Sequence, residues 1–168
     1  PLVAARVVDQ DMNDVPQGEI GEIVYRGPQT MLGYWNNPWA TEEAFHGGWF
    51  HSGDLVRVDE EGFFYVVDRL KDMIISGGEN IYSAEVEAVI GDHPKVREVA
   101  VVGAPHEKWG ETPVAVVVPH DPADPPTLDE LVEFCLTRLA SYKKPTRLVI
   151  VNELPRNASG KILKTRLR

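Results

Sequence analysis

Two short apolar runs, Val99–Ala104 and Val114–Val118, limit more than any other feature how this chain can fold. A membrane-spanning helix needs about 20 apolar residues, so neither run can cross a bilayer and no membrane span is expected. Short runs rich in valine are typical of buried strands, which we expect at 96–102 and 114–118. Because such strands need covering layers, the sequence predicts a sheet packed against other elements.

Capping signals predict helices beside these strands. Thr127 and Glu130 form a capping box, in which each side chain satisfies a backbone N–H at the start of a helix. Ser83 is the expected cap of a second helix that ends near Gly91. Further elements are expected as short strands at 73–76 and 147–151 and a final short helix at 161–168. Together they predict an α+β domain over residues 71–168.

The first 70 residues have a different, β-rich pattern. Residues 19–26 predict a strand, and residues 54–67 predict a hairpin because a polar turn joins two β-branched and aromatic runs. One helical turn is expected at 41–45, within a connection rich in Gly, Pro and Trp. We therefore expect two domains, 1–70 and 71–168.

Charge is distributed unevenly along the chain. The formal net charge is −9, but residues 141–168 carry +7 and residues 1–140 carry −16. A basic island attracts phosphates, whereas the acidic remainder would repel a long polyanion, so we expect a nucleotide-sized partner rather than nucleic acid. The alternative is a solvated helix face with no ligand.

Cysteine, histidine and the start of the chain argue against several other classes. The single Cys135 cannot form an intramolecular disulfide, and its place on an apolar helix stripe predicts a core thiol rather than a nucleophile. The five histidines lack metal-site spacing, so no metal site is expected. The chain begins at Pro1 without a signal-type segment, which predicts a cytoplasmic fragment or processed product.

A candidate ribose site occurs where an aromatic segment enters the predicted hairpin. In WFHSGDL, residues 49–55, Asp54 can accept hydrogen bonds from the vicinal hydroxyls of a ribose. Arg69 offers a planar set of donors suited to phosphate and ribose oxygens. From the residues alone, an ordinary turn acid is the favoured interpretation of Asp54.

Two further segments carry a family resemblance. Residues 68–81 are DRLKDMIISGGENI, and residues 155–164 are PRNASGKILK. With WFHSGDL and GPQTMLGYWNNP at 27–38, they resemble the end of an adenylate-forming enzyme of the acyl-CoA synthetase type. The resemblance covers the whole chain. It implies the C-terminal portion of a fatty-acid or aryl-acid CoA ligase, with a small mixed α/β lid domain after a β-rich remnant of the large N-terminal domain.

The resemblance implies roles for individual residues. Lys161 would be the catalytic residue, carried to the α-phosphate of ATP on a mobile loop, and Lys71 would be the hinge about which the lid rotates. Asp54 and Arg69 would bind the nucleotide. From composition alone, Lys161 is a solvated helix start and Lys71 an exposed polar residue. The basic residues at 164–168 are expected to be solvated.

A second set of residues would face CoA. Gly77 and Gly78 lack a Cβ, so their backbone can approach the pantetheine arm closely. Trp109 and Tyr142 match positions that contact CoA in related ligases, and Lys144 would meet a phosphate. A buried core role for Trp109 remains an alternative.

The implied reaction has two steps. A carboxylic acid and ATP give an acyl-adenylate and pyrophosphate, and the CoA thiol then attacks the adenylate to give a thioester and AMP. Magnesium would accompany ATP. Its ligand, the phosphate loop and the acid pocket are expected in the missing N-terminal domain, so this chain alone should be inactive. Two alternatives remain: a non-catalytic CoA-binding, nucleotide-binding or regulatory module, and an enzyme that loads a carrier protein.

Overall fold

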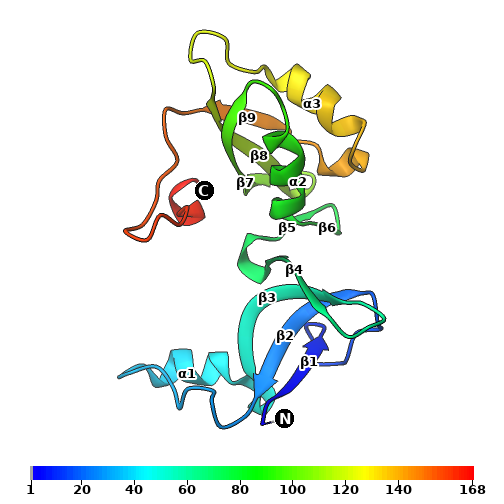
Figure 1. The fold of residues 1–168 in the computed structure, drawn as a ribbon, viewed down its shortest axis with the longest axis vertical. Coiled ribbons are helices and arrows are strands. Elements are labelled where there is room, and N and C mark those ends of the chain that lie inside the picture. Colours follow the sequence, from blue (N-terminus) through cyan, green and yellow to red (C-terminus); the bar gives the residue numbers. More distant parts are fainter. Residues whose placement is uncertain (1) are drawn as a thin grey trace. The chain divides into compact units, whose positions relative to one another are not determined.

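The computed structural model describes residues 2–168, which form two units that divide after Lys71 (Figure 1). The units are Pro1–Lys71 and Asp72–Arg168, and this division lies one residue from the predicted domain boundary. No helix in residues 2–168 is long and apolar enough to span a membrane.

The first unit is a four-stranded antiparallel sheet whose strands follow one another in chain order. Its strands are β1 (Ala4–Val8), β2 (Ile20–Arg26), β3 (Phe50–Val58) and β4 (Phe64–Arg69). The predicted strand and hairpin are therefore confirmed as β2 and as β3 with β4. In place of the single turn expected at 41–45, a seven-residue helix, α1 (Pro38–Ala44), begins earlier. Asn37 caps it by accepting the Ala40 N–H at 3.1 Å, and proline is favoured at its first position.

The second unit is a mixed sheet with two helices. Its strands are β5 (Ile74–Ser76), β6 (Glu79–Ile81), β7 (Val96–His106), β8 (Gly110–Pro119) and β9 (Arg147–Ile150), and its helices are α2 (Ser83–Gly91) and α3 (Leu128–Leu136). The order is β6-β5-β8-β7, and β9 pairs with β8 in parallel. The two apolar runs thus form the antiparallel pair β7 and β8, and the predicted α+β class is confirmed.

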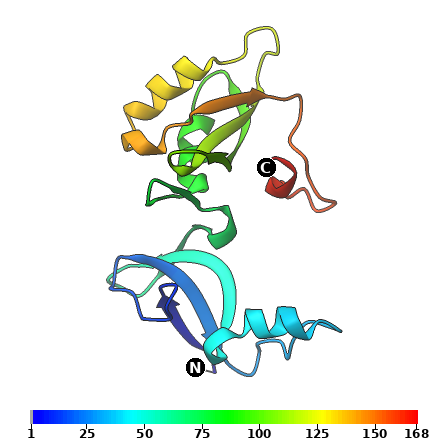
Figure 2. The ribbon, with the colours of Figure 1, turned by 180° about the vertical axis from the view of Figure 1, so that it is seen from behind.

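Both faces of this sheet are covered, as the apolar runs require. Alternate residues of β7 and β8 point to opposite faces, so each strand contributes to two separate cores. On one face, Val101 and Val117 pack with the helix residues Ile90 and Leu131. On the other face, Val102 and Val116 belong to a cluster that includes Leu154 and partly buried Ile162 and Leu167 of the C-terminal segment. The segment after β9 therefore acts as a second covering layer (Figure 2).

One helix cap is confirmed and another is wrong. Thr127 and Glu130 form the predicted capping box at the start of α3. Ser83 is the first residue of α2 rather than its cap; Tyr82 is the cap residue and makes no side-chain capping bond. The Ser83 side chain is fully buried and instead accepts a hydrogen bond from Lys164 Nζ at 2.7 Å.

The final helix predicted at 161–168 is also wrong. Only a 3-10 turn at Lys164–Arg166 forms. The preceding residues are engaged in an antiparallel bridge between Arg156 and Ile162, and the Leu163 N–H donates to the Pro155 carbonyl at 2.8 Å. Because these backbone groups are used across the chain, a helix cannot start before Lys164.

Candidate active-site residues

The ladder of the first sheet brings Asp54 and Arg69 together. These two residues are partners in the register of β3 and β4, and Arg69 Nε lies 3.3 Å from Asp54 Oδ1. The Arg69 side chain is 44% exposed and the Asp54 side chain 34% exposed, so both remain accessible to a ligand. Because a guanidinium has five N–H donors, this single contact leaves Arg69 with donors for another acceptor. The sequence predicted both residues as nucleotide ligands, and the fold makes them neighbours.

A buried carboxylate that the sequence did not single out contacts the residues just before Asp54. Glu22 of β2 is 9% exposed; it accepts the Gly53 N–H at 2.8 Å and lies 2.7 Å from His51 Nδ1. The pairing of β2 with β3 is irregular here, since the register shifts between Glu22 and Val24. Glu22 thus replaces ladder bonds that the irregularity removes. A glutamate in a strand is ordinarily solvated, so its pattern alone gave no signal of this role.

A hydroxyl completes the support of Asp54. Ser52 Oγ donates to the Ile23 carbonyl at 2.6 Å and accepts the Asp54 N–H at 3.0 Å. Gly53 between them has a φ of +71°, a left-handed conformation that favours glycine. The Ser-Gly-Asp sequence therefore has a local structural reason as well as a candidate ligand.

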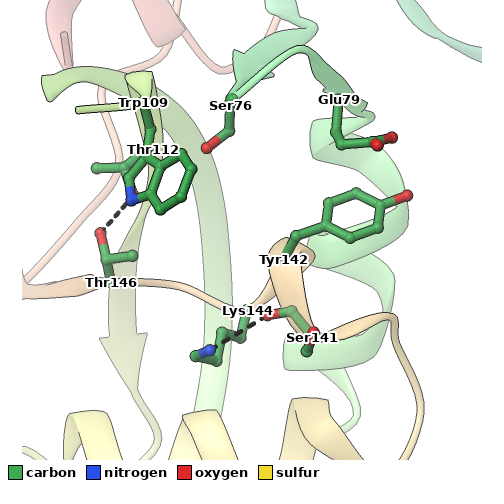
Figure 3. Close-up of a pocket in the computed structure, with 9 residues that line it drawn as sticks. Ser76, Glu79, Trp109, Thr112, Ser141, Tyr142, Lys144 and Thr146 are labelled. Atoms are coloured by element: carbon green, nitrogen blue, oxygen red, sulfur yellow. Dashed lines mark hydrogen bonds between the residues drawn. The ribbon is translucent and has the colours of Figure 1, made fainter.

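A pocket of about 290 Å³ in the second unit gathers four of the predicted CoA residues. Trp109 and Tyr142 stand on opposite sides of it and Lys144 lies below them, as Figure 3 shows. Gly77 also lines the pocket. Trp109 and Tyr142 are 45% and 42% exposed, so a buried core role for Trp109 is wrong.

The two glycines of the β5–β6 turn have different constraints. A Cβ on Gly77 would lie 2.8 Å from Trp109 Cε3, and the Gly77 N–H donates to the Trp109 carbonyl at 2.8 Å. Gly78 has a φ of +88°, but a Cβ there would meet no atom within 4 Å. Gly77, with a φ of +61°, is therefore favoured both by backbone conformation and by the close approach to the indole, and Gly78 by backbone conformation alone.

Positive charge and hydroxyl groups complete the lining of this pocket. Lys144 Nζ donates to the Ser141 carbonyl at 3.3 Å, a long bond that leaves two ammonium hydrogens for another acceptor. Thr112 and Thr146 share a hydrogen bond of 2.8 Å. Lys108 is outside the pocket lining, but its Nζ lies 4.4 Å from the Trp109 ring centroid. An aromatic pair beside a lysine is suited to an adenine or pantetheine group that carries phosphate.

Lys161 and Lys164, three residues apart, have opposite environments. Lys161 is exposed, and its side chain makes no ion pair with any residue from 2 to 168. Lys164, expected to be solvated, has a side chain only 15% exposed and lies 2.6 Å from Glu87 Oε1. The prediction for Lys164 is wrong because the C-terminal segment folds back onto α2 and buries it.

Much of the basic island is neutralised within the second unit. Four of its eight cations form ion pairs: Lys143 with Glu85, Arg156 with Glu98, Lys164 with Glu87 and Arg168 with Asp72. Composition therefore overstated the charge that this segment offers to a phosphate partner. Lys161 and Lys144 form no ion pair with residues 2–168, so their charges stay available to a phosphate group.

Two profiles of enzyme families match the chain. The AMP-binding enzyme C-terminal domain matches residues 85–161, and the AMP-binding enzyme matches residues 1–35. The feruloyl-CoA synthase of an Amycolatopsis species is 54% identical over 154 residues, 92% of this chain and 31% of that protein. The long-chain-fatty-acid–CoA ligase FadD13 of Mycobacterium tuberculosis is 53% identical over 150 residues, 88% of this chain and 29% of that protein. The chain belongs to the AMP-binding enzyme family.

A solved member of this AMP-binding family has the same fold. The o-succinylbenzoate CoA synthetase (MenE) of Bacillus subtilis, in complex with the acyl-adenylate intermediate OSB-AMP, is 44% identical with a TM-score of 0.88. The match covers 99% of this chain and 34% of that one. The same enzyme is also solved with ATP and a magnesium ion. The chain therefore spans about a third of the length of the relatives it matches.

The remaining predicted residues of this AMP-binding chain can now be located. Lys71 is exposed within a 3-10 turn, Leu70–Asp72. Cys135 is fully buried in the core under α3, where burial raises the pKa of its thiol, so it is not an activated nucleophile. Across residues 2–168, no three His, Cys, Asp or Glu side chains lie close enough together to hold a metal ion.

Proposed function

We propose that this chain is the C-terminal part of an ATP-dependent, AMP-forming acid–CoA ligase. The observation that carries the proposal is the exposed Lys161 ammonium, which makes no ion pair with residues 2–168 although four other cations of the same segment are paired. Family membership supports it, since the matched relatives are named as CoA synthases and CoA ligases. The chain would supply a lysine to a site that the rest of the protein completes.

Lys161 would act in the first step. Attack of a carboxylate on the α-phosphate of ATP brings two anions together and increases negative charge on the phosphoryl oxygens. A preorganised cation that contacts both groups lowers this barrier, because its charge is already oriented where charge develops. An ammonium without an internal partner needs no ion pair broken before it acts.

Asp54 and Arg69 would hold the nucleotide. The Asp54 carboxylate would accept hydrogen bonds from the two ribose hydroxyls. The remaining guanidinium N–H groups of Arg69 would donate to ribose or phosphate oxygens. The pocket beside Gly77 would receive CoA in the second step, with Trp109 and Tyr142 against its apolar arm. Lys144 would bind a CoA phosphate.

The acid, the metal and the cell compartment complete the proposal. The matched relatives act on fatty and aryl acids according to their names, so we propose a fatty or aryl acid as the substrate. Magnesium would accompany ATP, with its protein ligand in sequence outside this chain, as the family resemblance implies. The protein would act in the cytoplasm.

Substitution of Lys161 in the full-length enzyme tests the proposal. Lys161→Ala should lower pyrophosphate exchange by a factor of hundreds, the size expected for loss of one preorganised donor. Thioester formation from supplied acyl-adenylate should change only a few-fold. The matched control is Arg166→Ala, another exposed cation of the same segment, which should leave both half-reactions unchanged. Equal losses in both half-reactions would refute the role of Lys161.

The hinge role of Lys71 predicts the opposite pattern. Lys71→Pro fixes φ at the short connection that would absorb a domain rotation. We expect normal pyrophosphate exchange and a loss of thioester formation. Unchanged overall turnover would remove the hinge from the proposal.

The Trp109 pocket also favours a second candidate function, CoA binding without catalysis. Titration calorimetry of the 168-residue chain with CoA, combined with pyrophosphate exchange by the full-length protein, distinguishes the two. Binding that Trp109→Ala abolishes, together with a full-length protein that shows no pyrophosphate exchange with any acid, would establish a binding module. Turnover with a carrier protein but not with free CoA would instead identify the carrier protein as the acceptor of the acyl group.

A further inference from the structure

Residues 155–163 form a small hairpin that carries the predicted catalytic Lys161. The Asn157 N–H donates to the Lys161 carbonyl and the Gly160 N–H to the Asn157 carbonyl, both at 2.9 Å. Gly160 has a φ of +83°, the left-handed conformation needed to close this turn. Lys161 therefore extends from a hydrogen-bonded turn.

One side-chain oxygen organises this turn. Asn157 Oδ1 accepts the Lys161 N–H at 2.9 Å, the Ser159 N–H at 3.1 Å and the Ser159 hydroxyl at 2.8 Å. Asparagine commonly fixes turns in this way, because its carbonyl oxygen imitates a backbone acceptor. Three donors converge on it within the four residues that follow, and the last donor belongs to Lys161 itself.

The base of the hairpin is fixed to the body of the second unit on both sides. Before the turn, Arg156 donates from Nη1 to the Gly160 carbonyl at 2.7 Å and forms an ion pair with Glu98 of β7. After the turn, Lys164 is paired with Glu87 of α2, whose Oε1 also accepts the Val101 N–H of β7 at 2.7 Å. With its base fixed, the conformation of the hairpin tip determines where Lys161 points.

We infer that Asn157 is a positioning residue that sets the direction of the Lys161 side chain. The inference rests on the proposed role of Lys161 in adenylate formation. Asn157 touches no reacting atom in this scheme; it acts by restricting the turn that presents the ammonium. Adenylation depends on placement of that charge to within about 1 Å, so a loosened turn reduces the rate without removing the cation.

The test compares three variants of the full-length enzyme. Asn157→Ala removes the acceptor, and Asn157→Ser keeps a shorter, weaker one. Ala158→Ser is the control, since this exposed neighbour lies in the same turn and its substitution removes no acceptor. Each variant is assayed for pyrophosphate exchange, for thioester formation from supplied adenylate, and for hydrogen exchange of the peptide spanning residues 157–163.

Asn157→Ala should lower kcat of pyrophosphate exchange about 10- to 100-fold, with KM for ATP changed less than about threefold. Its hairpin amides should exchange at least tenfold faster, and thioester formation should stay near wild type. Asn157→Ser should recover part of both losses, and Ala158→Ser should match wild type. Wild-type hydrogen exchange in Asn157→Ala, or an equal loss of both half-reactions, overturns the inference.

The two proposals can fail separately. If Lys161→Ala retains pyrophosphate exchange, the proposed function fails, and hydrogen exchange alone still decides whether Asn157 orders the turn. If Lys161→Ala is inactive but Asn157→Ala keeps full kcat, the proposed function stands and the positioning role of Asn157 is refuted.

Discussion

The two units hold their candidate functional charges in different ways. In residues 2–71, Asp54 lies in a strand ladder and is already paired with Arg69, and buried Glu22 accepts the N–H of the preceding Gly53. In residues 72–168, Lys161 extends from a hairpin without an ion-pair partner among the described residues, whereas nearby Lys164 is buried in a pair. The first unit presents a preassembled pair, whereas the second presents Lys161, a cation without an ion pair among residues 2–168.

The contrast between Lys164 and Lys161 separates charges that stabilise the fold from charges that are available to a ligand. A buried pair cannot lose one member cheaply, because the other would stay desolvated and unpaired. An exposed charge costs little to remove, since water replaces its interactions. Stability and activity measurements should therefore rank the same residues in different orders.

The largest stability effect should come from Lys164→Ala. Glu87, whose side chain is only 23% exposed beside Lys164, would lose its cation, so we expect a loss of about 2–3 kcal/mol in the free energy of unfolding of the second unit. Urea denaturation followed by circular dichroism measures it. Lys161→Ala is the matched control and should change stability by less than about 0.5 kcal/mol. Equal destabilisation by the two substitutions would break the comparison.

A second effect should distinguish the paired glycines. Gly78→Ala should cost about 1–2 kcal/mol from left-handed strain alone. Gly77→Ala carries the same strain and also places a methyl group 2.8 Å from Trp109, so we expect about 1 kcal/mol more. Thermal unfolding of both variants, each repeated in a Trp109→Ala background, isolates the contact. The extra cost should vanish there; its persistence would exclude the indole as the cause.

A smaller, pH-dependent effect is expected at the capping box of α3. Hydrogen bonds from the Thr127 backbone and from Lys95 lower the pKa of Glu130 from 4.5 to about 2. The Glu130 carboxyl group binds its proton less tightly in the folded state than in the unfolded state. Glu130 therefore contributes its full stabilisation of the fold above about pH 4.5, and this stabilisation is lost as the pH falls toward 2. The difference in melting temperature between wild type and Glu130→Gln should therefore shrink over this range. A constant difference from pH 6 to pH 2 would contradict this linkage.

The smallest stability effect is expected in the first unit. Arg69 and Asp54 form a half-exposed pair, so Arg69→Gln should change the free energy of unfolding by less than about 1 kcal/mol. The same substitution should weaken ATP binding in the full-length enzyme, measured as a higher KM for ATP in pyrophosphate exchange. A large loss of stability would mean that the pair is structural, and the contrast between the units would then disappear.

Local patterns predicted much of the fold correctly. The apolar runs, the hairpin and the α3 capping box depend on residues close in sequence, and all three are confirmed. The failures involve residues whose partners are distant. Ser83 has a good capping side chain, but its hydroxyl oxygen accepts a hydrogen bond from Lys164, 81 residues later. The final helix gives way to a hairpin because Ile162 packs on the sheet.

The predicted site was recovered unevenly for the same reason. The motifs around Asp54, Gly77 and Lys161 were identified because they are contiguous. Glu22 and Asn157 were missed, since their importance lies in the groups they contact and both residue types are common on surfaces. The catalytic, ribose and CoA roles themselves stay predictions until the substitutions are made.

The sequence by itself determined the α+β class, the glycine turns and the segments that carry the candidate chemistry, because these follow from local backbone preference and apolar periodicity. Only the tertiary structure decided which charged side chains form ion pairs within the fold and which stay exposed. Lys161 and Lys164 are chemically identical and three residues apart, yet one is solvated and the other lies 2.6 Å from Glu87. Ion pairing depends on distance and burial, and both are set by contacts between residues far apart in the chain.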